Sequence, residues 1–146
     1  MKAYADTSFV ISLYSPDANS AAAASTMHSR RSGQETTVFT TVLGELEIVN
    51  ALELRIFRKE VSASEAQSSL TNFESDLRGG VFQLRPLSDQ FFARARELSR
   101  QTTARLGTRT TDLLHVAAAL ELGVDRLYTF DRHQRKLAQA LRIGLN

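Results

Sequence analysis

Short segments rich in β-branched and aromatic residues alternate along this chain with longer segments of helical periodicity, and this alternation restricts the possible folds. Strand character is found in residues 2–5, 36–40, 81–84 and 126–130, with a weaker fifth segment near residues 142–143. Strands that are separated by helices pair in parallel through crossover connections, and the helices then cover both faces of the sheet. The sequence therefore predicts an α/β fold with a central parallel sheet.

The helical segments between these strands carry recognisable end signals. Ser62 and Glu65 fit a capping box at the start of one helix, and Gly33 and Gly123 stand where two others are expected to stop. The predicted helices cover residues 9–14, 16–31, 41–58, 62–78, 88–101, 109–122 and 132–141. A chain of 146 residues suits one domain with a real core, so residues 1–146 are expected to fold as a single unit.

Four carboxylates occupy positions where an ordinary solvent-exposed acid is not expected. Asp6 and Asp131 follow predicted strands, and ligands of open α/β sheets bind outside the carboxyl ends of the strands. Glu47 and Asp112 lie inside apolar helical patterns, where an acid is costly unless it has a partner. Converging acids in an apolar setting are typical of a site that holds a hard cation through oxygen ligands.

Three of these acids also have a simpler interpretation. Asp6 and Asp131 each precede a predicted helix and can act as its N-cap, a role compatible with binding a cation. Asp112 lies near the start of a helix that is apolar nearly all round and is therefore expected to be buried. The helix N-terminus would favour its negative charge, so capping alone is the alternative to a site role.

The fourth position is ambiguous because Glu45 and Glu47 are two residues apart on one predicted helix. Side chains two residues apart point about 200° away from each other, so both cannot face the same pocket. Periodicity alone does not choose between them. His115 is open as well: three residues after Asp112, it is either a packed residue with one hydrogen bond or a catalytic or metal-binding group.

Composition narrows the chemistry. The chain has no Cys, which excludes disulfides, thiolate zinc sites and cysteine nucleophiles. No apolar run approaches the roughly 20 residues that span a bilayer, and the start of the chain has no signal-peptide core, so a cytoplasmic protein without a membrane segment is expected. Of its 18 basic residues 15 are Arg, whose planar guanidinium suits phosphate, although an Arg-rich proteome would give the same count.

Four segments resemble, in order and spacing, the motifs of PIN-domain nucleases. These segments are Ala5-Asp6-Thr7-Ser8, Glu47 with Asn50-Ala51-Leu52, Asp112-Leu113-Leu114-His115-Val116-Ala117-Ala118-Ala119, and Thr129-Phe130-Asp131. Each motif is weak by itself, but together they extend over almost the whole chain. The most similar subgroup is that of the VapC-like toxins of bacterial toxin–antitoxin pairs.

The resemblance implies a three-layer α/β/α sandwich and a Mg²⁺- or Mn²⁺-dependent endoribonuclease. It implies that Asp6, Glu47, Asp112 and Asp131 are the catalytic and metal-binding acids. The pattern of an acid followed three residues later by Asn-Ala-Leu favours Glu47 over Glu45. Implied partners are an RNA substrate, a cognate antitoxin protein and a second copy of the chain.

Four further residues are expected to support the acids. Ser8 and Thr129 match polar positions that commonly stand beside the acids of this family. Arg109 precedes Asp112 and is a candidate for stabilising negative charge on a phosphodiester, as is Arg132 after Asp131.

Other readings of the same acids fit less well. A receiver-type phosphorylation domain needs a Lys after the last strand, and the late Lys136 lies within a predicted helix. A dehalogenase-type phosphatase needs Asp-x-Asp, whereas Ser8 occupies the second acidic position. The serious alternatives are a PIN-like domain that binds RNA or protein without cutting, and a nuclease directed at DNA.

Overall fold

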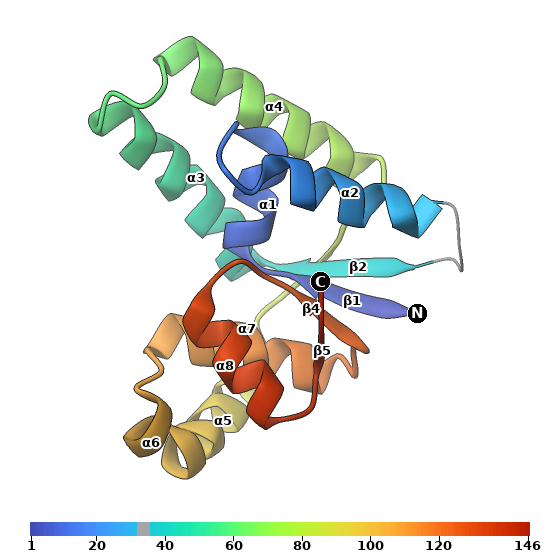
Figure 1. Ribbon diagram of the computed structural model, residues 1–146, viewed down its shortest axis with the longest axis vertical. Helices are drawn as coiled ribbons and strands as arrows, with labels where there is room; N and C mark the ends of the chain where they lie inside the picture. Colours follow the sequence, from blue (N-terminus) through green and yellow to red (C-terminus); the bar gives the residue numbers. More distant parts are fainter. Residues whose placement is uncertain (32–35) are drawn as a thin grey trace.

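A parallel β-sheet runs through the middle of the molecule in the computed structural model, which describes residues 1–31 and 36–146 (Figure 1). Within these residues five strands pair in the order β3-β2-β1-β4-β5, with every pair parallel. The strands are β1 Lys2–Ala5, β2 Thr37–Thr41, β3 Gln83–Arg85, β4 Arg126–Tyr128 and β5 Gly144–Leu145. The predicted parallel sheet is confirmed, with strand ends shifted by at most two residues.

Helices cover both faces of the sheet, as predicted for a three-layer α/β/α sandwich. On one face lie α1 Thr7–Tyr14, α2 Ser20–Arg31, α3 Val42–Phe57 and α4 Ala63–Arg78, and on the other lie α5 Asp89–Leu98, the π-helical turn η1 Ser99–Thr103, α6 Ala104–Leu106, α7 Thr110–Glu121 and α8 Arg132–Ala140 (Figure 1). No helix within the described residues is long and apolar enough to cross a membrane.

Side chains of the central strand β1 alternate between two hydrophobic cores, because successive residues of a strand point to opposite faces. Tyr4 packs into the core that the sheet shares with α5, α7 and α8. Ala3 and Ala5 pack into the core on the side of α1, α3 and α4. All three side chains are fully buried, so β1 is fixed from both faces. The residue that follows β1 is therefore held rigidly.

Several helix ends agree with their sequence signals and others do not. Ser62 and Glu65 form both hydrogen bonds of a capping box, which confirms that prediction. Gly123 has φ of 60° directly after α7, a conformation that glycine adopts without strain. The predicted stop at Gly33 lies outside the described residues. The helix expected from residue 16 begins only at Ser20, and the one expected to reach residue 101 changes to a π-helical turn after Leu98.

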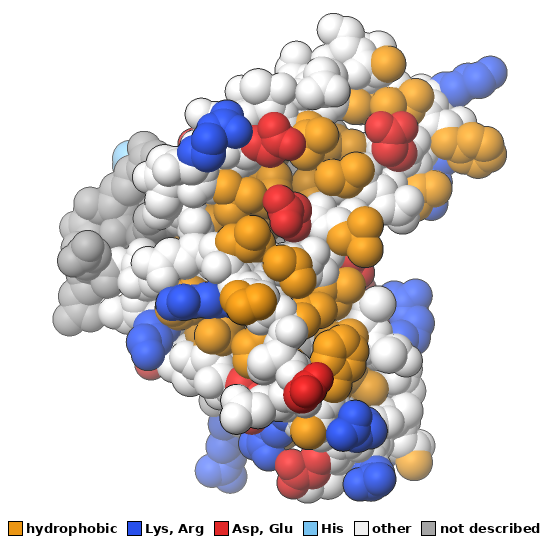
Figure 2. All heavy atoms as spheres, turned by 180° about the vertical axis from the view of Figure 1, so that it is seen from behind, with side chains coloured by type: hydrophobic (Ala, Val, Ile, Leu, Met, Phe, Trp, Pro, Cys, Tyr) orange, Lys and Arg blue, Asp and Glu red, His pale blue; other side chains and the backbone are white. Residues whose placement is uncertain are grey.

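The outer face of α3 carries an exposed apolar stripe. Val42, Leu46 and Val49 recur at helical spacing, yet their exposed fractions are 40%, 65% and 38%. Ile48 and Leu52, one residue away from that stripe, are buried instead. Figure 2 shows hydrophobic side chains gathered on the back of the molecule, with acids between them. A surface of this kind is typical of an interface.

The carboxyl ends of β1 and β4 form the topological switch point of the sheet. From β1 the chain continues through α1 and α2 on one face, whereas it reaches β4 from α7 on the other face. The two strands are neighbours, with Tyr4 opposite Leu127. Beyond their carboxyl ends the molecular surface is indented between the two helical layers (Figure 2). Ligands of open α/β sheets bind at such a point.

Candidate active site

Asp6 is the central acid of the candidate site. It follows β1 directly, its backbone N–H donates to the carbonyl of Tyr128 on β4 at 3.1 Å, and its side chain is 1% exposed. The carboxylate caps α1 by accepting a hydrogen bond from the backbone N–H of Phe9 at 2.9 Å. Both the capping role and the position at the carboxyl end of a strand are thus present in one residue.

Ser8 and Thr129 fix the Asp6 carboxylate from two sides. The Ser8 hydroxyl donates toward both carboxylate oxygens, at 2.8 and 2.9 Å, and accepts a hydrogen bond from the backbone N–H of Phe130. Thr129 Oγ1 donates to Asp6 Oδ2 at 2.7 Å. The structure therefore brings both of these predicted supporting residues to Asp6.

Asp131 is connected to this group through Thr129. Its backbone N–H donates to Thr129 Oγ1 at 3.0 Å, and one oxygen of its side chain caps α8 by accepting hydrogen bonds from the backbone N–H groups of His133 and Gln134. Its carboxylate is half-buried. Asp131 thus lies beside Thr129, one of the two residues that hold the Asp6 carboxylate. One of its own carboxylate oxygens is already used to cap α8.

Glu47, and not Glu45, faces the other acids. Glu47 Oε2 accepts hydrogen bonds from Thr7 Oγ1 and from His115 Nε2, the latter at 2.6 Å. Glu45 lines a separate shallow hollow together with Glu74 and residues of α4 and β3. The two side chains leave α3 on different sides, as expected for residues two apart on a helix.

Asp112 approaches from α7, in the first turn of the helix, and is 5% exposed. Gln134 Nε2 donates to its Oδ1 at 3.3 Å. Arg109 Nε donates to its Oδ2 at 3.3 Å, while the Arg109 side chain is 71% exposed. The arginine fork therefore stands between the buried acid and solvent, where it can meet an anionic ligand.

His115 links three of the four acids electrostatically and is only 2% exposed. Its Nδ1 lies 2.8 Å from the hydroxyl of Tyr4, and its Nε2 is the atom bonded to Glu47. Burial by itself lowers the pKa of His115, but the hydrogen bond to Glu47 and the charges of Asp6, Glu47 and Asp112 raise it above its ordinary value. His115 is thus neither a merely packed residue nor an isolated one.

The acids have unequal electrostatic environments. Burial raises the pKa of Asp6, and the charge of His115 and the hydrogen bonds from Phe9, Thr129 and Ser8 only partly offset this. Burial also acts to raise the pKa of Glu47, but His115 and Thr7 outweigh it and hold that pKa below its ordinary value. A buried carboxylate that resists ionisation is stabilised when a cation comes near.

The donor set suits a hard divalent cation, since Mg²⁺ prefers carboxylate oxygens and retains several waters. Within the described residues, no three carboxylate or imidazole side chains come close enough together to hold one ion. Each of the four acids is instead engaged by hydrogen-bond donors of the protein. Their common role as metal ligands therefore stays a prediction, supported by the chemistry of the oxygens and the burial of Asp6.

Two residues of this cluster were not expected from the sequence. Gln134 is 4% exposed on α8, and Tyr4 is fully buried on β1. Glutamine in a basic amphipathic helix carries no signal by itself, and tyrosine in a strand is ordinary. The one signal for Gln134 in the sequence is its position as a polar residue three places after a strand-end Asp.

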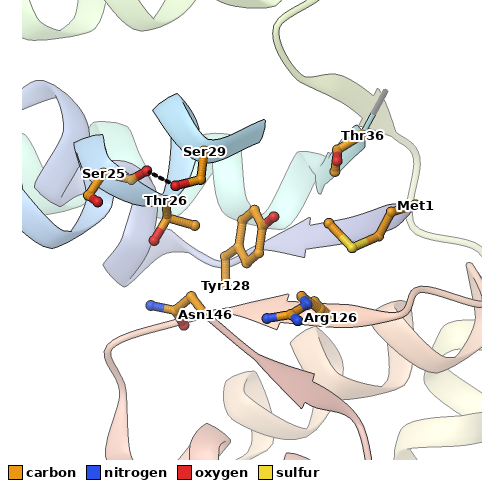
Figure 3. A pocket seen from close by; sticks show the side chains of 8 residues that line it. All are labelled: Met1, Ser25, Thr26, Ser29, Thr36, Arg126, Tyr128 and Asn146. Carbon is orange, nitrogen blue, oxygen red and sulfur yellow. Dashed lines mark hydrogen bonds between the residues drawn. The ribbon is translucent and has the colours of Figure 1, made fainter. Parts of the chain in front are cut away.

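A second polar hollow lies elsewhere on the sheet (Figure 3). Hydroxyl groups from α2 face Tyr128 and Arg126 of β4 across it. Met1, Thr36 and Arg126 come from the beginnings of their strands or just before them, whereas Asp6 and Asp131 follow the carboxyl ends of β1 and β4. None of the four acids lines this hollow.

The sequence and the fold are similar to known proteins. Residues 3–140 match the family described as PIN domain. A search of curated proteins finds no match. Among solved structures, VapBC2 from Rickettsia felis, bound to a DNA fragment from its promoter, superposes with a TM-score of 0.71 at 16% identity and covers 100% of this chain and 98% of that one.

Two other solved structures have similar scores. VapBC-1 from nontypeable Haemophilus influenzae gives a TM-score of 0.67 at 13% identity, covering 100% of this chain and 97% of that one. Mycobacterium tuberculosis VapC20, described as a toxin that cleaves the sarcin–ricin loop, gives 0.64 at 18% identity and covers 94% of each chain. At these identities the likeness concerns the fold.

Proposed function

This chain belongs to the PIN domain family, and from that premise we propose that it is a metal-dependent endoribonuclease and the toxin of a toxin–antitoxin pair. The observation that carries the proposal is the buried Asp6, bonded by Ser8 and Thr129 at the switch point of the sheet. Around it stand Glu47, Asp112 and Asp131.

Asp6, Glu47, Asp112 and Asp131 would hold Mg²⁺ or Mn²⁺. When bound, the cation supplies a positive charge that makes water more acidic and offsets the negative charge developing on the phosphodiester. Asp6 is the strongest candidate for a direct contact, because burial opposes its ionisation and a cation would relieve that cost. Asp112 is the second, since it is also buried and lies near His115.

The remaining residues orient these groups and meet the substrate. Ser8 and Thr129 donate to Asp6 and so keep its oxygens in one orientation. Arg109 has an exposed guanidinium beside Asp112, and Arg132 is exposed at the start of α8. A planar guanidinium binds phosphate oxygens through two N–H groups, so these arginines are suited to hold an RNA backbone. Hydrolysis by water would leave 5′-phosphate and 3′-hydroxyl ends.

The proposed partners follow from the same reading. VapBC2 and VapBC-1 are structural neighbours whose names denote VapBC systems, and we extend a cognate antitoxin to this chain. A second copy of the chain is the proposed occupant of the exposed apolar stripe on α3, formed by Val42, Leu46 and Val49. Because the substrate is RNA, the cytoplasm is the proposed compartment.

A cleavage assay with purified protein and total RNA tests this function. Discrete fragments are expected with Mg²⁺ or Mn²⁺ and none with EDTA, and the ends of the fragments identify the target. Asp6→Asn should abolish cleavage while the circular dichroism spectrum is unchanged. Asp89→Asn is the matched control, because Asp89 is an exposed acid in the first turn of α5.

Each of the other possible outcomes would indicate a different function or mechanism. Cleavage that survives EDTA would contradict a metal-dependent mechanism. Binding of RNA without cleavage, by a folded protein that also binds Mn²⁺, would favour a binding domain or a narrow target. Cleavage of single-stranded or duplex DNA, but not of RNA, would replace the proposed ribonuclease with a DNA-directed enzyme.

A further inference from the structure

We propose that His115 is a positioning residue that presents the carboxylate of Glu47 to the site, and that Tyr4 fixes His115 for this task. The inference rests on the proposed function, because it assumes that Glu47 takes part in holding the cation. It adds a role for two residues that contribute no carboxylate. The carrying observation is a continuous hydrogen-bonded chain from the sheet through the imidazole to the acid.

The contact between His115 and Glu47 has a defined donor. Nε2 lies 2.6 Å from Glu47 Oε2, and an ionised carboxylate can only accept hydrogen bonds, so the N–H lies on Nε2. This holds whether the imidazole is neutral or charged. The same carboxylate oxygen accepts a hydrogen bond from Thr7. Two donors from different elements therefore converge on one oxygen and leave the other oxygen of Glu47 for a ligand.

The imidazole is itself held from behind. Its Nδ1 lies 2.8 Å from the hydroxyl of Tyr4, which also lies 3.1 Å from Thr41 Oγ1. Tyr4 belongs to the central strand and is fully buried, so the packing of the sheet fixes the position of its hydroxyl. The ring of His115 is thus fixed at both nitrogens. Metal-ligating groups are commonly oriented by such outer contacts, whose loss weakens metal binding.

Glu47 needs this support more than the other acids do. Its side chain is 28% exposed and leaves the middle of α3 on a flexible stem, whereas Asp6 and Asp112 are short and almost fully buried. A glutamate loses considerable rotamer freedom when it is held in one conformation. A fixed donor reduces the number of orientations before the ligand arrives, which is the usual benefit of preorganisation.

Calorimetric titration with Mn²⁺ alone, in the absence of RNA, tests the inference. His115→Leu should weaken Mn²⁺ binding by about 10-fold or more, and His115→Gln, which retains an N–H donor, should recover part of the loss. The decisive measurement is made on the double variant Glu47→Gln/His115→Leu. In a Glu47→Gln background His115→Leu should cause no further loss, because His115 acts through Glu47 and a general structural defect would add to the effect.

Further variants keep the outcomes distinct. If His115→Leu does not fold, Tyr4→Phe removes a single oxygen and should produce a smaller loss that also disappears in the Glu47→Gln background. His28→Leu, on the exposed face of α2, is the matched control and should bind Mn²⁺ like the parent. Circular dichroism and the melting temperature of each variant report on the fold.

The results separate this inference from the proposed function. If the parent protein binds no Mn²⁺, or binds it equally after Asp6→Asn, the proposed function fails. If the parent binds Mn²⁺ through Asp6 and Glu47 but His115→Leu binds equally well, only the positioning role is overturned. Tighter binding by His115→Leu would overturn it too, because His115 would then compete with the cation for Glu47.

Discussion

Gln134 donates a hydrogen bond from its side-chain amide to Asp112, with Nε2 of the first 3.3 Å from Oδ1 of the second. The backbone N–H of the same glutamine donates to Asp131 at 2.9 Å. Gln134 thus joins an acid in the first turn of α7 to the acid that caps α8. Its buried amide oxygen has no hydrogen-bond partner among the described residues, so the bond to Asp112 is the one that orients the amide.

Replacing Gln134 by Leu should lower the cleavage rate by about 10- to 100-fold with little change in fold, the range typical of groups that orient metal ligands. Leu has a similar volume and removes the unpartnered oxygen as well as the donor. Gln139→Leu, on the exposed side of α8, is the control. The rate constants at saturating Mg²⁺ provide the comparison, and equal rates for the parent and both variants would remove Gln134 from the site.

The two glutamates of α3 should differ sharply. Glu47→Gln is expected to reduce cleavage by about 100-fold or more, since it removes the charge of the proposed metal ligand that is hydrogen-bonded to His115. Glu45→Gln should change the rate by less than about threefold, because Glu45 lines a different hollow. Cleavage of a defined RNA under single-turnover conditions measures both. A larger defect in the Glu45 variant would reverse the assignment.

Divalent metal should stabilise the folded protein. A cation present at about 100 times its dissociation constant adds about 2.7 kcal/mol if it binds only the folded state. The melting temperature is therefore expected to rise with Mn²⁺ in the parent protein, and to rise much less in Asp6→Asn and Asp112→Asn. A shift of equal size in Asp6→Asn would show that the ion binds elsewhere.

Without metal, stability should fall as the pH rises above 6.5, the ordinary pKa of histidine. The pKa of His115 is raised above its ordinary value of 6.5, so its contribution is full below that value and is lost as the pH rises through the higher folded-state pKa. The raised pKa of Asp6 acts in the same direction above its ordinary 3.8, while the lowered pKa of Glu47 matters only under acidic conditions.

Melting temperatures in EDTA across this range measure that effect. The parent protein should melt at progressively lower temperature as the pH increases, and His115→Gln should show a flatter profile because it lacks the titrating group. A parent profile that is level or rising above pH 6.5 would contradict the assigned directions of the pKa shifts.

The apolar stripe on α3 should control the oligomeric state. Leu46 is 65% exposed, so Leu46→Glu costs little in the monomer but would bury a charge in an interface between two copies. Light scattering after gel filtration should give a dimer for the parent and a monomer for the variant. Leu54→Glu, at the side of the same helix and 39% exposed, is a useful comparison. A monomeric parent would exclude this use of the stripe.

Much of the fold followed from local sequence signals. The β-branched segments and the helices between them predicted a parallel sheet, and the capping box at Ser62 located the start of α4. The π-helical turn after Leu98 and the exposed stripe on α3 were not predicted. Hydrophobic periodicity reports which residues are apolar, and it cannot distinguish a face that packs within the chain from one that awaits a partner.

Some residues of the candidate site were likewise predictable from the sequence, and others were not. The sequence by itself identified Asp6 and Asp131 as strand-end acids, because the order of elements dictates where the carboxyl ends of parallel strands lie. Only the tertiary structure turned Glu47 rather than Glu45 toward His115. It alone brought Tyr4 and Gln134 to the acids, from β1 and α8. The physical reason is that strand ends are fixed by local hydrogen bonding and topology, whereas the direction in which a helical side chain points depends on the packing of distant elements around it.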